Sequence, residues 1–177
     1  MRYVALLRGI NVGGHKMVAM ADLRALLTRL GFADVKAVLQ SGNIVFGSTA
    51  RSAARLESQL ESEVAKTLTV TTEFHVRDAA EWQAVIDANP FPAEAARAPS
   101  HLLVTFFKEP LAAAAVAALQ AAITGPERLQ AEGRHLYMTF PDGAGTSKAA
   151  VLAGRMLPSG TARNWNTVMK LSALTGR

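Results

Sequence analysis

Cysteine is absent from the 177 residues, which excludes disulfides and thiolate metal sites. A long apolar run is also missing. The longest, residues 111–123, is mostly alanine and is interrupted by Gln120, so it is too short to span a bilayer. Met1 leads into a strand-like segment rather than a signal-peptide pattern. From these absences we expect a cytoplasmic protein without membrane association.

Acidic residues are missing from both ends of the chain. Residues 1–21 contain three bases and no acid, and residues 143–177 contain five bases and no acid. The net charge is +5 and the pI is about 10.0. If the two ends meet, they form a positive surface suited to phosphate or nucleic acid. The alternative is the mild basicity common in soluble bacterial proteins.

Half of the residues are hydrophobic and only 19% are charged, so a folded core is expected. The first part of the chain alternates strand and helix patterns in the order βαββαβ. This order is typical of a ferredoxin-like subdomain, predicted over residues 1–77. The predicted strands are residues 3–7, 35–39, 44–46 and 70–76, and the predicted helices are residues 21–30 and 52–66.

Residues 78–100 are predicted to form a short helix, opened by the capping pair Asp78 and Glu81, followed by a linker rich in proline and alanine. A second α+β subdomain is predicted over residues 101–177. Its order is βαββαα, a degenerate copy of the first with a helix in place of the last strand. Its predicted strands are residues 101–107, 129–131 and 135–140, and its predicted helices are residues 111–123, 146–156 and a last helix that Thr161 can cap.

The segment from Arg8 to Lys16 joins an apolar strand to a helix and contains three glycines and two bases but no acid. It does not fit a P-loop, because a histidine separates Gly14 from Lys16 and Met17 stands where Ser or Thr is needed. Its backbone can instead cradle an anion, with Arg8 and Lys16 supplying charge. The competing interpretation is a long turn with glycines at positive φ.

Two further segments are candidates for chemistry. Ser41, Gly42 and Asn43 form a turn between strands, and Ser41 lacks the Gly-x-Ser-x-Gly setting of a nucleophile. Ser147 and Lys148 open a helix after a glycine-containing turn. A helix start with a hydroxyl and a lysine suits an anion, but it is also an ordinary cap.

Residues 161–167 (TARNWNT) gather polar donors at the start of the last helix. Arg163 and Lys170 are candidates for holding phosphates, Asn164 and Asn166 for reading polar groups, and Trp165 for stacking. The alternative is structural, with Asn164 capping the helix and Trp165 anchoring it in the core.

No metal or cofactor is predicted. The four histidines stand more than five residues apart along the chain, so no zinc pattern is present. No pair of acidic residues has the character of a general acid and base. The histidines are His15, His75, His101 and His135.

Four segments in order resemble a bacterial domain-of-unknown-function family: residues 7–14 (LRGINVGG), 39–46 (LQSGNIVF), 89–91 (NPF) and 161–167 (TARNWNT). The family often has a further lysine where this chain has His15. The resemblance covers essentially the whole chain and implies two α+β subdomains, the first ferredoxin-like. It points to polar loop residues as a site: Arg8, Asn11, Ser41, Asn43, Arg163, Asn164, Asn166 and Lys170. We expect the loop after residue 7 and the turn at residues 41–43 to lie at opposite ends of the sheet.

Three hypotheses follow. The first is a binding protein for nucleic acid or a phosphorylated small molecule. The second is an enzyme acting on a phosphorylated substrate, with Ser41 or Ser147 and Lys148 in the site. The third is that these motifs fix the interface between subdomains. The candidate anion-binding residues are Arg8, Gly9, Asn11, Gly13, Gly14, Lys16, Ser41, Asn43, Ser147, Lys148, Arg163, Asn164, Trp165, Asn166 and Lys170.

Overall fold

The structure, a computed structural model, describes residues 1–14 and 16–176. The chain divides into two compact units. Unit 1 comprises residues 1–84 together with the C-terminal stretch from Lys170, and unit 2 comprises Val85–Met169. Each unit is built on a four-stranded antiparallel sheet with helices. This arrangement confirms the predicted α+β class with two subdomains.

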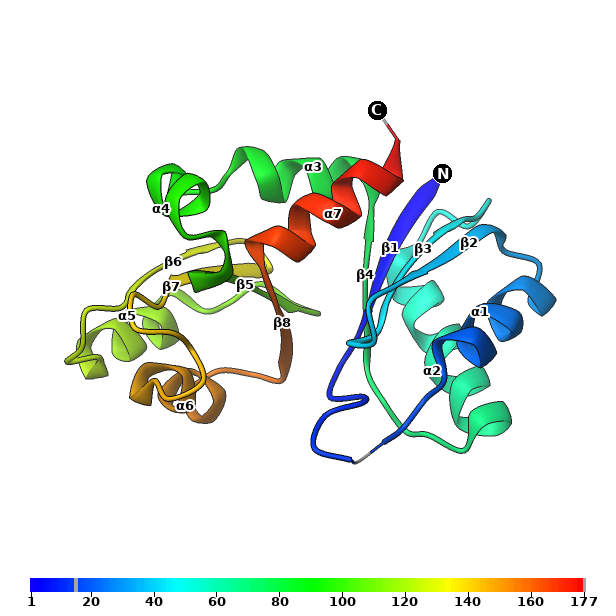
Figure 1. The fold of residues 1–177 in the computed structure, drawn as a ribbon, viewed down its shortest axis with the longest axis horizontal. Helices are drawn as coiled ribbons and strands as arrows, with labels where there is room; N and C mark the ends of the chain where they lie inside the picture. The colour runs from blue at the N-terminus through cyan, green and yellow to red at the C-terminus, as the bar shows by residue number, and fades with distance from the viewer. Residues whose placement is uncertain (15, 177) are drawn as a thin grey trace. The chain divides into compact units, whose positions relative to one another are not determined.

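Unit 1 has the predicted ferredoxin-like order. Its strands lie in the order β2-β3-β1-β4, and every neighbouring pair is antiparallel. Figure 1 shows both helices on one side of this sheet. The elements are β1 (Arg2–Leu7), α1 (Met20–Arg29), β2 (Ala33–Val38), β3 (Asn43–Gly47), α2 (Ala53–Leu68) and β4 (Phe74–Asp78).

The core of unit 1 follows from apolar spacing. Leu23, Leu26 and Leu27 of α1 recur at helical spacing, so they share one face and are buried. They pack in one cluster with alternate residues of β1, such as Ala5 and Leu7. Because side chains alternate across a strand, these residues lie on the sheet face that carries the helices.

Unit 2 repeats the topology of unit 1. Its sheet has the order β6-β7-β5-β8, again antiparallel throughout. Figure 1 shows its two helices, α5 and α6, on one side of this sheet. The elements are β5 (Leu102–Phe107), α5 (Ala113–Ala122), β6 (Arg128–Glu132), β7 (His135–Thr139), α6 (Lys148–Met156) and β8 (Gly160–Asn164).

The structure corrects one element of unit 2. Residues 160–164 form strand β8 rather than the start of the last helix, so the order is βαββαβ followed by α7 (Trp165–Thr175). The buried positions of this strand are Thr161 and Arg163. Because both are polar, the alternation typical of a half-buried strand was hidden in the sequence. Asn164, and not Thr161, caps the helix that follows.

Short helices fill the segment after β4. Helix α3 (Ala79–Asp87) opens with the predicted capping pair: the Asp78 amide donates to Glu81 Oε2 (3.0 Å) and the Glu81 amide to Asp78 Oδ1 (2.8 Å). The stretch expected as a linker is helical, with α4 (Pro92–Arg97) and the 3₁₀ helix η1 (Pro99–His101). Proline in a first turn is compatible with both. Among the described residues, no helix is long and apolar enough to cross a membrane.

Candidate anion-binding site

An unusual stretch of backbone lies between β1 and α1. We call residues 8–19 the β1–α1 loop; His15 lies outside the described residues. The φ angle is positive at Gly9, Asn11 and Gly13 but not at the residues between them, so its sign alternates along this stretch. Where residues alternate between the right-handed and left-handed helical regions, neighbouring backbone N–H groups can converge on one concave side and bind an anion. In this loop the Asn11 amide already donates to the Lys16 carbonyl, so a ligand would have to use the other N–H groups. The φ angle is also positive at Gly14 and Lys16.

The surface of this loop is open. A Cβ atom built on Gly9 or Gly14 would meet nothing within 4 Å. Gly13 and Lys16 are exposed, and so is the apolar side chain of Val12, at 64%. The main chain of the loop is therefore accessible to a ligand from solvent.

Asn11 holds the loop in shape. Its side-chain amide donates to the carbonyls of Val18 (2.9 Å) and Gln40 (2.7 Å). Its Oδ1 accepts the backbone N–H of Val18 at 2.8 Å. Its own backbone N–H donates to the carbonyl of Lys16 at 3.2 Å. One side chain thus closes the loop on itself and ties it to the β2–β3 turn.

The bond to Gln40 overturns the expectation that this loop and the β2–β3 turn lie at opposite ends of the sheet. The two segments are neighbours, because β1 and β3 are antiparallel and Leu6 pairs with Asn43, so β1 ends where β3 begins. The Leu7 amide donates to the Gly42 carbonyl at 2.9 Å. A Cβ atom on Gly42 would stand 2.7 Å from Ile10 Cδ1. Glycine is required there for close packing.

The other two candidates in this turn differ in accessibility. Asn43 is fully buried, and its amide donates to the Val38 carbonyl (2.9 Å) and to Ser41 Oγ (3.0 Å). It shapes the turn from within. Ser41 is exposed.

Two bases and one acid set the local charge. Arg8 is about half exposed, and its Nε lies 3.8 Å from Glu73 Oε2. An exposed pair at this distance is weak, so an anionic ligand can compete for the guanidinium. The same Glu73 oxygen lies 4.0 Å from Nε2 of the buried His75. Lys16, later in the loop, is exposed as well.

Glu73 and Thr72 were not predicted to belong to this region. The Arg8 amide donates to the Glu73 carbonyl at 3.0 Å, and Thr72 Oγ1 donates to the Arg8 carbonyl at 2.7 Å. Both contacts follow from the pairing of β1 with β4. Such pairing between strands far apart along the chain leaves no local signal, so only the sheet order could have revealed it.

A cavity of about 710 Å³ lies elsewhere in unit 1. Its lining includes Arg2, Phe32, Gly47 and Gln59 and none of the predicted site residues. The β1–α1 loop is therefore a surface feature, distinct from this cavity.

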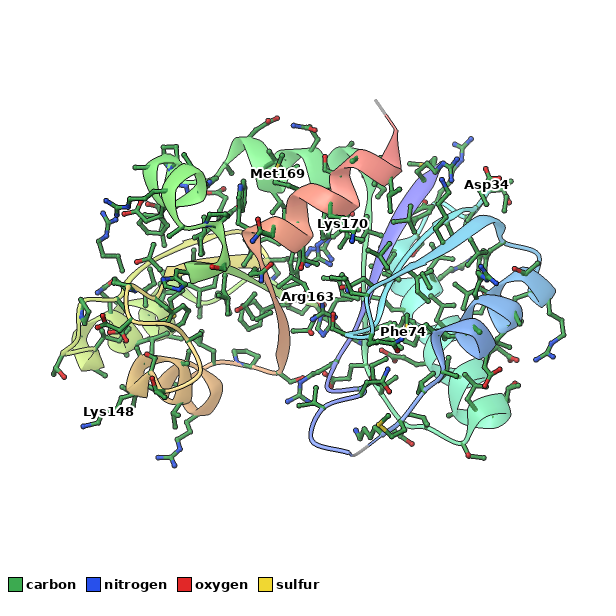
Figure 2. The ribbon with its side chains drawn as sticks, in the orientation of Figure 1. Asp34, Phe74, Lys148, Arg163, Met169 and Lys170 are labelled. Carbon is green, nitrogen blue, oxygen red and sulfur yellow. The ribbon has the colours of Figure 1, made fainter. Side chains whose placement is uncertain are left out.

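In unit 2, Ser147 caps α6. Its Oγ accepts the amides of Ala149 (3.1 Å) and Ala150 (3.4 Å) and donates to Glu127 Oε1. The carboxylate of Glu127 thus occupies the place where an anion would meet this helix start. Figure 2 shows Lys148 at the start of the helix, well away from Arg163 of the same unit.

The adjacent cavity, of about 310 Å³, has acidic residues in its lining. Glu127 and Asp142 line it together with Ser147 and Lys148. Two carboxylates beside one lysine leave the cavity with a net negative charge, which disfavours the binding of an anion. We therefore base no anion site on this cavity.

Arg163 is buried in β8 with 8% exposure. Its Nη1 donates to Thr161 Oγ1 (2.7 Å) and to the Ala162 carbonyl (2.8 Å). Burial lowers the pKa of its guanidinium to about 10, so it stays charged at neutral pH. These contacts give Arg163 a structural role within unit 2.

The remaining candidates lie on the last helix. Asn164 Oδ1 accepts the Thr167 amide at 3.0 Å, so it is the N-cap of α7, and Trp165 is buried. Both observations fit the structural alternative. Asn166 and Lys170 are exposed, and Figure 2 shows Lys170 on α7.

The structure thus gathers one group of predicted residues around the β1–α1 loop of unit 1. These are Arg8, Gly9, Asn11, Gly13, Gly14, Lys16, Ser41 and Asn43. The second group belongs to unit 2, and Lys170, assigned to unit 1, stands apart from both groups. This second group is Ser147, Lys148, Arg163, Asn164, Trp165 and Asn166.

Comparisons with known proteins agree with this fold. The family model described as "Protein of unknown function (DUF1697)" matches residues 1–137. A solved structure, that of conserved bacterial protein SP0830 from Streptococcus pneumoniae, is similar over 98% of both chains, with 29% identity and a TM-score of 0.74. No curated protein matches the chain.

Proposed function

This chain belongs to the DUF1697 family, and we propose that it is a binding protein for a phosphate-bearing ligand, held at the β1–α1 loop of unit 1. The observation that supports the proposal most is the alternation of φ between Gly9 and Gly13. Arg8 and Lys16, at either end of this stretch, supply positive charge. Such a loop binds phosphate through main-chain N–H groups and strengthens the contact with charge.

The preformed shape of the loop adds support. Because Asn11 fixes the loop without a ligand, binding costs little ordering entropy. The open surface suits an extended or highly charged ligand better than a small apolar one. The lack of cysteine favours a reducing compartment, and we propose the cytoplasm as the place of action.

The test is fluorescence anisotropy with labelled single-stranded RNA, single-stranded DNA and duplex DNA, at low and at physiological salt. Phosphorylated metabolites are screened in parallel by thermal shift. We expect binding that weakens with salt. The double variant Arg8→Gln/Lys16→Gln should weaken binding and lower the salt slope by about two.

A matched control removes the same charge elsewhere. Lys148 and Arg155 are both exposed on α6 of unit 2. The variant Lys148→Gln/Arg155→Gln should bind as the wild type does. An equal loss in both double variants would mean that net charge, and not the loop, attracts the ligand. No binding by any phosphate-bearing probe at low salt would reject the proposal.

A further inference from the structure

Strand β6 is an edge of the sheet in unit 2. It joins β7 through a turn at Gly133 and Arg134, and Glu132 pairs with His135. The residues that flank such a turn exchange hydrogen bonds, so the backbone groups of every second residue of β6 point toward β7. The N–H and C=O groups of Leu129 and Ala131 therefore point away from the sheet.

The corresponding edge strand of unit 1, β2, is by contrast protected against pairing. The register of β2 shifts between Ala33 and Lys36, and Asp34 has a φ of +49°. A bulge and an exposed lysine are common means of preventing a further strand from adding to an edge. In β6 the five residues pair with β7 in continuous register. This edge is regular and open to another strand.

Helix α5, beside β6, is uncharged although most of its residues are not buried, as expected of a helix that a partner covers. Its ten residues (AAAVAALQAA) include no charged side chain, and only Leu119 is buried. The exposed faces of surface helices usually carry charges, as α2 does. Between α5 and β6 lies a groove of about 510 Å³, lined by Val116, Ala117, Leu129 and Ala131 among others. An apolar groove along an open edge marks an interaction surface.

The charges of β6 indicate which partner fits. The strand reads Arg128, Leu129, Gln130, Ala131, Glu132, with a base at one end and an acid at the other. Antiparallel pairing with an identical strand, centred on Gln130, places each Arg128 opposite the Glu132 of the other copy. In the same register, Leu129 faces Ala131, and these are the residues whose backbone groups point outward.

We propose that a second copy of this chain pairs with it through β6, joining the two sheets of unit 2 into one antiparallel sheet about a twofold axis at Gln130. The axis is perpendicular to the sheet, so α5 of both copies lies on the same side. The small side chains of α5 allow the two helices to approach closely. Leu129 and Val116 of both copies then close the groove.

Arg128 is available for this contact. Its guanidinium pairs with Glu94 and lies 5.0 Å from the centre of the Phe91 ring, yet its side chain remains 59% exposed. The carboxylate of Glu132, on an exposed residue, can therefore add a second partner.

The experiment is sedimentation velocity on the full chain at micromolar concentrations, with three charge variants. Arg128→Glu places two acids opposite each other, and Glu132→Arg places two bases opposite each other, so each variant alone should dissociate about tenfold more readily. A one-to-one mixture of the two variants restores both opposite-charge pairs. The mixture should form a heterodimer as tight as the wild-type dimer, as should the double variant Arg128→Glu/Glu132→Arg.

A variant that alters the backbone of β6 tests the same pairing independently of charge. Ala131→Pro removes an N–H that points away from the sheet, whereas Ala131→Val keeps it. The proline variant should be monomeric and retain the circular dichroism of the wild type, and the valine variant should dimerise. A wild-type chain that stays monomeric even at a protein concentration of about 100 μM would overturn the proposal. So would a mixture of the two charge variants that associates no better than either alone.

Discussion

Arg77 and Arg163 occupy the same position in the two sheets. Arg77 of β4 lies opposite Val4 of β1, and Arg163 of β8 lies opposite Val104 of β5. Each donates Nη1 to the carbonyl of the residue before it, at 2.9 Å and 2.8 Å. Both are buried, at 0% and 8% exposure. The units thus repeat each other at the level of single residues.

The repeat continues into the next residue. Asp78 follows Arg77 and Asn164 follows Arg163, and each accepts the amide three residues further on, at 2.8 Å and 3.0 Å. A buried arginine followed by an Asx cap is therefore a feature of the fourth strand in both units. Arg163 and Asn164, which the sequence placed in a ligand site, have this structural role.

We predict that Arg163→Ala lowers the free energy of unfolding by about 3 kcal/mol, because a large buried side chain and its hydrogen bonds are lost. Arg77→Ala should cause a similar loss. Neither variant should change the affinity for a phosphate-bearing probe once corrected for the folded fraction. Urea denaturation and anisotropy on the same samples measure both. A stable Arg163→Ala protein that no longer binds would instead place Arg163 in the ligand site.

Gly42 and Gly14 form a matched pair for substitution. Their φ angles are +77° and +76°, but an added Cβ meets Ile10 and Leu7 at Gly42 and open space at Gly14. We predict that Gly14→Ala costs about 1 kcal/mol, from backbone strain alone. Gly42→Ala should cost about 2 kcal/mol more, because the core must shift. Equal losses in urea denaturation would show that the turn rearranges freely.

Replacing Asn11 should loosen the β1–α1 loop. Asn11→Gly removes three side-chain hydrogen bonds but tolerates the φ of +54°, so we expect a loss of about 2 kcal/mol. Asn11→Ala should lose about 1 kcal/mol more, because alanine is strained at positive φ. Hydrogen exchange at the Val18 amide, which donates to Asn11 Oδ1, should accelerate in both variants. Unchanged protection at Val18 would mean that other contacts hold the loop.

The stability of the chain should depend on Tyr137 at high pH. Burial raises the pKa of the Tyr137 hydroxyl above its ordinary value of 10.0, and this hydroxyl donates to the Val85 carbonyl at 2.6 Å. Above pH 10 the unfolded chain loses this proton while the folded chain keeps it, so stability falls as pH rises. Below pH 10 this contribution is fully present.

Tyr137→Phe isolates the effect. At pH 7 the variant should be less stable by about 1 kcal/mol, because it lacks the hydrogen bond. Above pH 10 the difference from the wild type should shrink, since phenylalanine has no proton to lose. Urea denaturation between pH 7 and 11 gives the difference curve, in which the titrations of all groups that the two proteins share cancel. A difference that stays constant with pH would contradict the assignment.

Much of the fold could be predicted because apolar residues recur at clear intervals. The leucines of α1 and the apolar run of β1 identified a helix and a strand, and Asp78 with Glu81 identified a helix start. Strand β8 was missed because Thr161 and Arg163, its buried residues, resemble a polar loop. Pro158 and Gly160 lie just before these residues and are typical of turns, so they give no sign of a strand.

The candidate site was harder to predict because its contacts cross the sheet. The sequence identified the glycines and bases of the β1–α1 loop but placed the β2–β3 turn at the wrong end. The antiparallel pairing of Leu6 with Asn43 brings them together. The role of Asn11 depends on the Gln40 carbonyl, and no local pattern could reveal a partner so far along the chain.

The two units secure the same junction by different means. In unit 1 the side chain of Asn11 reaches the carbonyl of Gln40 in the β2–β3 turn. In unit 2 the corresponding turn is held by the main chain, where the Leu111 amide donates to the Gly133 carbonyl at 3.1 Å. Any residue but proline preserves the second bond, whereas a single codon change at Asn11 abolishes the first. In unit 1 the tie between loop and turn therefore depends on the identity of one side chain, whereas the equivalent tie of unit 2 tolerates almost any residue.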